Sequence, residues 1–116
     1  MFLILFIQKT ENMILTYIIS NSKDEAENIA NDLLEKKLVY SVNLFEDVSS
    51  MRWEKSKIVK LKRTIVLAKT KSLLYNEIEK EVKRVQTTGT AIVFSMPITQ
   101  MSQDLFDNIQ HFTLKV

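Results

Sequence analysis

The sequence contains no cysteine, one histidine, one glycine and one proline. Without cysteine there are no disulfides, no thiolate metal ligands and no thiol nucleophile. The single His111 excludes a metal site built from two histidines of one chain, and the single Gly89 excludes a glycine-rich phosphate loop. No serine–histidine–acid or cysteine–histidine set stands out either. We therefore expect a protein that is not an enzyme and has no cofactor and no metal site within the chain.

Long hydrophobic runs are also scarce, and the one exception occupies residues 1–7. A membrane span needs about 20 apolar residues, and a secretory signal needs a basic start and a small-residue cleavage site. Residues 1–12 are therefore interpreted as a hydrophobic extension: an extra strand, or a start placed upstream of the true one at Met13. A weak membrane or partner anchor is the alternative. Residues 13–116 are expected to form one domain, with no membrane partner.

The overall composition is that of an ordinary globular domain. The chain has 116 residues, of which 46% are hydrophobic and 26% charged, with a formal net charge of +2. This balance argues against disorder and implies no polyanionic partner by itself.

Hydrophobic periodicity predicts strand, helix, strand, strand, helix, strand and a helical tail. Residues 13–20 are apolar and β-rich, and Ser22 with Glu25 has the spacing of a capping box that opens a helix. Extended segments follow at about 38–53 and 57–70, joined by a turn at 54–57. A second helix is expected at about 71–85, a strand at 90–96, a helix capped by Ser102, and a brief strand at 113–116. This is the βαββαβ order of an α+β, ferredoxin-like sandwich, with both helices on one face of an antiparallel sheet.

The two middle strands are too long for one copy of the chain to cover. The first strand spans about 26 Å, whereas residues 38–53 would span about 50 Å at roughly 3.3 Å per residue. An isolated two-stranded hairpin is marginal in water, and its tip carries Met51, Trp53 and Ile58. We therefore predict self-association, without a defined number of copies.

Several segments, taken in order, resemble the CutA family of divalent-cation tolerance proteins. They are residues 13–18, residues 30–44, Trp53 with Lys57 and Ile58, residues 67–70 and residues 95–98. The resemblance covers residues 13–112, and its most specific part is the junction ending in Ser41, Val42 and Asn43. It implies a cytoplasmic homotrimer, a fold similar to the P-II signalling proteins, a link to tolerance of copper and other divalent metals, and ligand sites in the clefts between subunits.

The sequence departs from the family pattern where the ligand chemistry is expected. Ser41 stands in place of a cysteine, and residues 86–89 replace a His-Pro-Tyr-Glu segment. A lysine–serine turn replaces the glycine after Trp53, and residues 59–63 replace an acidic run. A hydroxyl is a weak ligand for a soft metal, so the sequence indicates a divergent member that keeps the scaffold and has lost most metal ligands.

Four residues are candidates for a ligand cleft between subunits: Asn43, Trp53, Lys57 and Lys69. Trp53 is either a stacking platform for a ligand or a packing anchor in an assembly interface. Lys69 either binds an anion with help from the N-terminus of the second helix or pairs with Glu77 or Asp47.

Charge is concentrated in one place, a run of six cations within residues 52–63. It is interpreted either as an anion-binding stripe or as a solvated strand face with edge lysines. Nucleic-acid binding is disfavoured because aromatic side chains are not interleaved with these cations. Glu46 and Asp47 are adjacent in a strand, so without a bulge they cannot chelate a cation together. His111 is expected at the surface.

We expect a homotrimeric CutA-like protein with a role in divalent-cation tolerance or response. The alternative is a P-II-like sensor that binds a nucleotide or other small anion at the subunit cleft.

Overall fold

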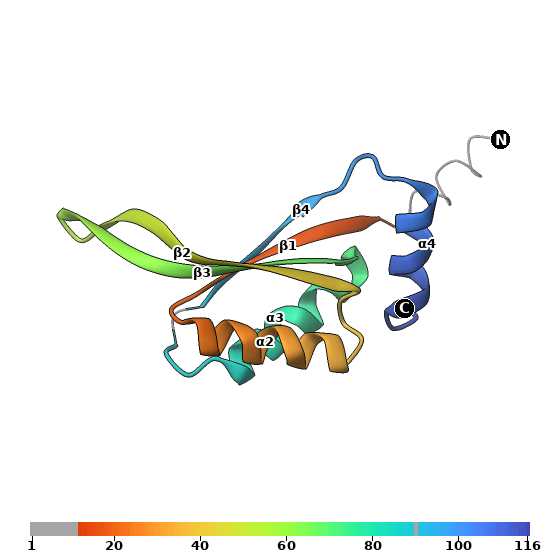
Figure 1. Ribbon diagram of the computed structural model, residues 1–116, viewed down its shortest axis with the longest axis horizontal. Helices are drawn as coiled ribbons and strands as arrows, with labels where there is room; N and C mark the ends of the chain where they lie inside the picture. Colours follow the sequence, from red (N-terminus) through yellow and green to blue (C-terminus); the bar gives the residue numbers. More distant parts are fainter. Residues whose placement is uncertain (1–11, 90) are drawn as a thin grey trace.

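The structure is a computed structural model that describes residues 12–89 and 91–116. A four-stranded antiparallel sheet has the order β2-β3-β1-β4, and its strands are β1 (Met13–Ser20), β2 (Ser41–Glu54), β3 (Lys57–Lys71) and β4 (Ile92–Pro97). Helices α2 (Lys23–Glu35) and α3 (Tyr75–Val85) cover one face, and α4 (Gln103–Phe112) lies at the end opposite the hairpin tip (Figure 1). The predicted α+β order and helical tail are confirmed.

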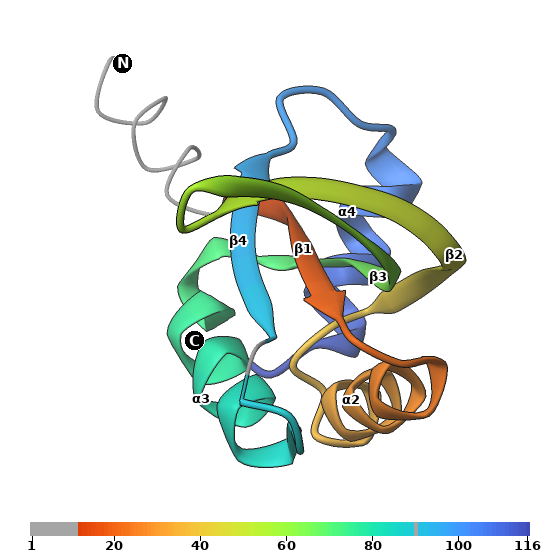
Figure 2. The ribbon, with the colours of Figure 1, turned by 90° about the vertical axis from the view of Figure 1, so that its left-hand side faces the viewer.

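Figure 2 shows from the end of the molecule that the helix layer lies on one side of the sheet. The core lies between the two layers. The apolar stripe of α2 is buried together with that of α3, because the three- and four-residue spacing places both stripes toward the sheet. Fully buried members of this core include Ile18, Ile29, Leu33, Val66, Leu74, Ile78 and Val82. Alternate residues of β1 and β3 therefore point away from the helices, onto the opposite face of the sheet.

The predicted starts of the second helix and of the second strand are wrong, and one predicted strand is absent. The second helix does not begin at residue 71, because Thr70 and Lys71 pair with Ile14 and Met13 of β1. A 3₁₀ turn, η1 (Ser72–Leu74), then leads into α3. Strand β2 begins at Ser41 instead of residue 38. No strand forms at residues 113–116, where Leu114 donates one backbone hydrogen bond to the carbonyl of Lys37 at 2.9 Å.

The predicted hydrophobic extension lies outside the described residues, apart from Asn12. None of the helices in the described part of the chain has the length and apolar character that a membrane crossing needs.

The hairpin of β2 and β3 projects beyond the sheet, as predicted. Strand β1 pairs with β3 only from Thr64 to Lys71, so the segments 48–54 and 57–63 form a two-stranded ribbon that pairs with no further strand among the described residues. The ribbon extends past the helices and gives the molecule a longest dimension of 54 Å (Figure 1). Glu54 pairs with Lys57, which confirms the turn at residues 54–57.

A β-bulge interrupts β2 where the ribbon leaves the sheet. Phe45 pairs with Ile65 and Val48 with Arg63, so Glu46 and Asp47 together stand opposite one residue of β3. Asp47 has a φ of 56°, in the left-handed region. Such a bulge bends its strand and increases the local twist.

Helix α2 ends in a Schellman motif. The amide of Leu38 donates to the carbonyl of Leu33 at 2.9 Å, and the amide of Lys37 donates to the carbonyl of Leu34 at 3.0 Å. The motif requires a left-handed residue, and Lys37 supplies it with a φ of 58°.

Replacing Lys37 with glycine is expected to stabilise the fold by about 0.5–1 kcal/mol, because glycine adopts this conformation without the steric cost of a side chain. Urea unfolding monitored by circular dichroism measures the change. Glu35→Gly, within the last turn of the same helix, is the control and should destabilise by about 1 kcal/mol. Equal destabilisation by both variants would contradict the prediction.

Candidate functional site

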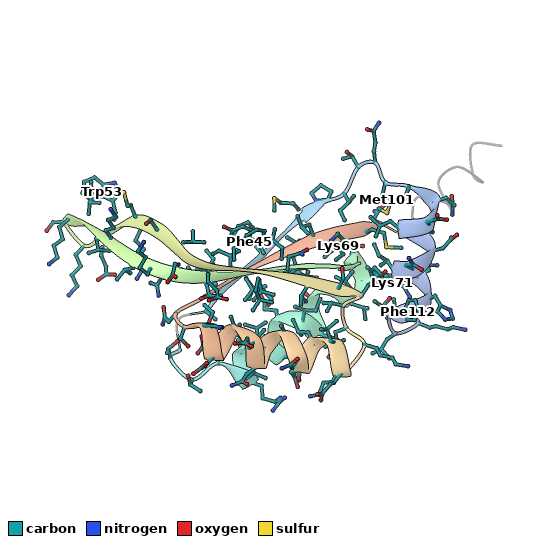
Figure 3. The ribbon with its side chains drawn as sticks, in the orientation of Figure 1. Phe45, Trp53, Lys69, Lys71, Met101 and Phe112 are labelled. Carbon is teal, nitrogen blue, oxygen red and sulfur yellow. The ribbon has the colours of Figure 1, made fainter. Side chains whose placement is uncertain are left out.

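The structure places the four candidate residues in two separate regions of one chain. Asn43 and Lys69 lie in the sheet, whereas Trp53 and Lys57 lie at the tip of the ribbon. Figure 3 shows Trp53 and Lys69 at opposite ends of the hairpin. Lys57 and Lys69 are 12 residues apart on β3, about 40 Å at roughly 3.3 Å per residue. The predicted cleft lies between subunits, so its composition stays a prediction.

The face of the sheet opposite the helices, here called the open face, is rich in apolar side chains. Val42, Ala68 and Val93 pack in or against the core on the helix side, so the residues that alternate with them along the strands lie on the open face. Tyr17 and Phe94 stack on the open face with ring centroids 4.9 Å apart. The side chains of Phe45, Ile92, Phe94 and Met96 remain between 39% and 49% exposed. An apolar surface of this kind is typical of an interaction site.

Lys69 also lies on the open face, opposite Ser41 in register, and Asn43 lies two residues further along β2, opposite Leu67. The neighbours of Lys69 along β3, Ala68 and Thr70, are completely buried on the helix side, so the Lys69 side chain points away from α3. The expected help from the N-terminus of the second helix is therefore wrong. No ion pair of Lys69 is present in residues 12–89 and 91–116, so the alternative pairing with Glu77 or Asp47 is also absent.

The ribbon tip carries a second apolar surface. Trp53 is 70% exposed and lines a shallow pocket with Met51, Arg52 and Ile58. Figure 3 shows Trp53 and Phe45 both pointing away from the helix layer. The tip and the open face therefore offer apolar side chains on the same side of the molecule.

Glu25 has a role that the sequence did not reveal. Ser22 caps α2 by accepting a hydrogen bond from the amide of Glu25, but the Glu25 carboxylate does not complete the predicted capping box. It instead accepts hydrogen bonds from Ser20 and from the amides and hydroxyls of Thr87 and Thr88. Burial raises the pKa of Glu25, but these hydrogen bonds outweigh burial, and the net pKa is lowered. The carboxylate fastens the loop between α3 and β4 to α2.

A group of charges joins the outer surfaces of α2 and α3. Arg84 pairs with Glu81 at 2.9 Å and with Asp32 at 3.0 Å, and Lys36 pairs with Glu81 at 2.6 Å. Hydrogen bonds from Arg84, Asp32 and Lys36 lower the pKa of Glu81 to about 2. Burial, and then the adjacent Glu81, raise the pKa of Asp32. Opposite pKa shifts of this kind are expected for two neighbouring acids that share one hydrogen bond. The ion pairs of Arg84 with Asp32 and of Lys36 with Glu81 link the two helices.

The bulge removes the geometric objection to a shared role for Glu46 and Asp47. Both acids line one pocket, but Lys62 and Arg63 line it too. These positively charged residues would repel a metal cation. Within the described residues, no group of three or more histidine, cysteine, aspartate or glutamate side chains could hold a metal ion. His111 is exposed and contacts Phe112 edge-on at 4.7 Å, which confirms its predicted place at the surface.

The C-terminal tail is fixed by a buried lysine. Lys71 is 3% exposed, and its ammonium donates a hydrogen bond to the carbonyl of Leu114 at 2.8 Å. Phe112 stacks on Tyr40, which precedes β2. These contacts hold α4 against the end of the sheet (Figure 3).

Comparisons with known proteins agree with one another. Residues 14–111 match the family described as CutA1 divalent ion tolerance protein. The Divalent-cation tolerance protein CutA of Archaeoglobus fulgidus is 35% identical over 91 residues, which cover 78% of this chain and 88% of that protein.

Solved structures give the same result. The structure of the Periplasmic divalent cation tolerance protein CutA from Archaeoglobus fulgidus is similar with a TM-score of 0.81 at 33% identity, covering 86% of this chain and 97% of the other. CutA1 from Oryza sativa is similar in fold, with a TM-score of 0.86 at 19% identity, covering 93% and 99%.

Proposed function

The chain belongs to the CutA1 divalent ion tolerance family, and from that premise we propose that it acts in cellular tolerance of divalent cations, copper in particular, as a homotrimer. The observation that carries the proposal is the match over residues 14–111 together with the apolar surface that one copy leaves uncovered. We propose a binding role without catalysis, exercised in the cytoplasm.

Self-assembly is supported by the energetics of the uncovered surface. Burial of apolar surface contributes about 25 cal/mol per Å². Phe45 and Phe94 on the open face, and Met51, Trp53 and Ile58 at the tip, are each more than one-third exposed in a single copy. A neighbouring copy that covers both surfaces would also give the ribbon the further strands that it lacks.

In such an assembly the ligand site would lie at the subunit cleft. Asn43 and Lys69 from one copy would meet Trp53 and Lys57 from the ribbon of another, because one chain keeps these pairs about 40 Å apart. Ser41 occupies the start of β2, where the family pattern has a soft cysteine ligand. We therefore propose that this member responds to divalent metals without a tight soft-metal site of its own.

Disrupting the open face should separate assembly from folding. Phe94→Asp places a charge among the apolar side chains of the interface, and we expect it to convert a particle of three 13.5 kDa chains into monomers. Leu73→Asp is the matched control, because Leu73 is 58% exposed on η1, outside the strands that form the open face. Light scattering measures the mass, and circular dichroism verifies folding. A monomeric unsubstituted protein would contradict the assembly.

A growth test addresses the cellular role. In a bacterial strain that lacks its own CutA relative, the chain should restore growth in elevated copper, and the Phe94→Asp variant should not. Titration with Cu²⁺ should show no saturable tight binding to the purified chain. If growth is unchanged and nucleotides, but not metals, raise the midpoint of thermal unfolding, the sensor alternative replaces this proposal.

A further inference from the structure

The end of the molecule opposite the ribbon tip carries apolar side chains that lie outside the open face. Leu73 on η1 is 58% exposed, and at the end of α4 and in the tail after it Phe112, Leu114 and Val116 are 52%, 44% and 59% exposed. These four residues are here called the end surface, and Figure 1 shows α4 at this end. None of them belongs to a strand of the sheet, so the assembly proposed above does not explain them. Exposed apolar side chains gathered in this way indicate an interaction surface.

The start of β1 lies beside the end surface. The amide of Ser72, which precedes the leucine of the end surface, donates to the carbonyl of Asn12 at 2.9 Å. Met13 pairs with Lys71 across the sheet, and the ammonium of Lys71 donates to the carbonyl of Leu114 at 2.8 Å. The start of β1 is therefore separated from the C-terminal tail by one strand spacing and one lysine side chain.

A buried acceptor on α4 lacks a donor at the same end. The Oε1 atom of Gln110 is buried and has no hydrogen-bond partner among the residues that the structure describes. Gln110 lies in the last turn of α4, four residues before Leu114. Because most buried polar atoms in proteins are hydrogen-bonded, this oxygen points to a donor outside the described residues.

The sequence before β1 supplies a segment of the matching chemistry. Residues 2–7 are all apolar, and residues 8–12 are all polar. Five residues span at most about 17 Å, which is enough for the apolar residues before them to reach the tail from Asn12. Six apolar residues are too few to cross a bilayer, which takes about 20. Contact with the end surface would remove two apolar surfaces from water at once.

We propose that residues 2–7 cover the end surface of the same chain, with their side chains on Phe112 and Leu114 and with a backbone amide donating to Gln110. The contact is formed within one chain and lies apart from the subunit cleft, so it does not depend on the proposed function.

Cross-linking of the full chain tests the contact, since the sequence has no cysteine of its own. The double variant Leu5→Cys/Leu114→Cys, treated with a short bismaleimide, should form a link within one chain. Leu5→Cys/Thr99→Cys is the reach-matched control, because Thr99 is exposed and follows Ile98, whose amide donates to the carbonyl of Met13 at 3.0 Å. The first pair should react at least about tenfold faster, because docking raises the effective concentration of its two thiols.

Peptide mass spectrometry identifies the linked residues, and a denaturing gel separates links within a chain from links between chains. Equal rates for the two pairs would overturn the proposal, because the segment would then be an undirected tether. Links between chains would overturn it in favour of a second copy as the occupant of the end surface.

Thermal unfolding gives a second measurement. Leu5→Asp places a charge in the apolar segment and should lower the unfolding midpoint by about 5 °C, whereas Thr10→Asp, in the polar connection, should leave it unchanged. Equal midpoints for the two variants would contradict the contact. Binding of the full chain to phosphatidylglycerol vesicles, if Leu5→Asp abolished it, would replace the end surface with a membrane. The intact mass of the protein made from its native locus should include residues 1–12, and a chain that starts at Met13 would also overturn the proposal.

Discussion

Glu25→Ala is expected to destabilise the fold by about 3 kcal/mol. The Glu25 side chain is 4% exposed and accepts hydrogen bonds from Ser20, Thr87 and Thr88. Its removal leaves several donors at a partly buried site without an acceptor, and each such donor costs about 1–3 kcal/mol unless water reaches it. Urea unfolding measures the loss, and hydrogen exchange should show early opening of the loop between α3 and β4.

The same carboxylate gives this loop a pH dependence. The pKa of Glu25 is lowered by folding from 4.5, so the carboxylate stabilises the folded state fully above pH 4.5. The contribution is lost as pH falls through the lower folded pKa. Glu25→Gln should flatten this part of the stability profile, whereas Glu27→Gln, exposed on the same helix, should leave it unchanged. Identical profiles for both variants would contradict the role of Glu25.

Leu33→Ala is expected to destabilise the fold by about 3–4 kcal/mol, at least as much as Glu25→Ala. Leu33 is completely buried where α2 meets the sheet and α3, and its removal costs both transfer energy and a cavity. Its side chain also belongs to the same apolar cluster as Leu38, the hydrophobic contact that accompanies the Schellman motif. Thermal and urea unfolding measure the change.

The adjacent residue provides a close control for this substitution. Leu34 is 37% exposed on the outer side of α2, beside a groove shared with Val42 and Leu44. Leu34→Ala should therefore cost less than about 1 kcal/mol. Equal effects at the two positions would mean that assembly buries Leu34 as deeply as folding buries Leu33.

The order of elements could be predicted from the sequence because local patterns and tertiary packing agree. The apolar spacing of Ala26, Ile29 and Leu33 is the one that the sheet buries, and Ser22 and Ser102 cap the helices that they precede. Boundaries failed where a strand ladder competes with local pattern: Lys71 joins β3 because Met13 is opposite it. Of the predicted capping box, the cap by Ser22 is present, but the Glu25 carboxylate is not part of it. Glu25 instead bonds to residues 62 and 63 positions further along the chain, which local spacing cannot show.

The candidate site could be predicted only in part, since its residues meet through contacts that a single chain does not contain. The family resemblance identified Trp53 and Lys69, but their separation and the open face depend on the register of four strands. Alternation of Ile92, Phe94 and Met96 was the available signal for the open face. Burial of Arg63 had no signal in the sequence, because its neighbours in the cationic run are exposed.

The β-bulge, in which Glu46 and Asp47 together stand opposite Thr64, sets the direction in which the ribbon leaves the sheet. Val48 stands opposite Arg63 and Phe45 opposite Ile65, so deleting Asp47 would preserve the strand pairs on either side and abolish only the kink. The core would keep all of its contacts, while the tip with Trp53 would point elsewhere. A single residue at the sheet edge thus steers the far end of the molecule, and the geometry of assembly can change while the stability of each copy does not.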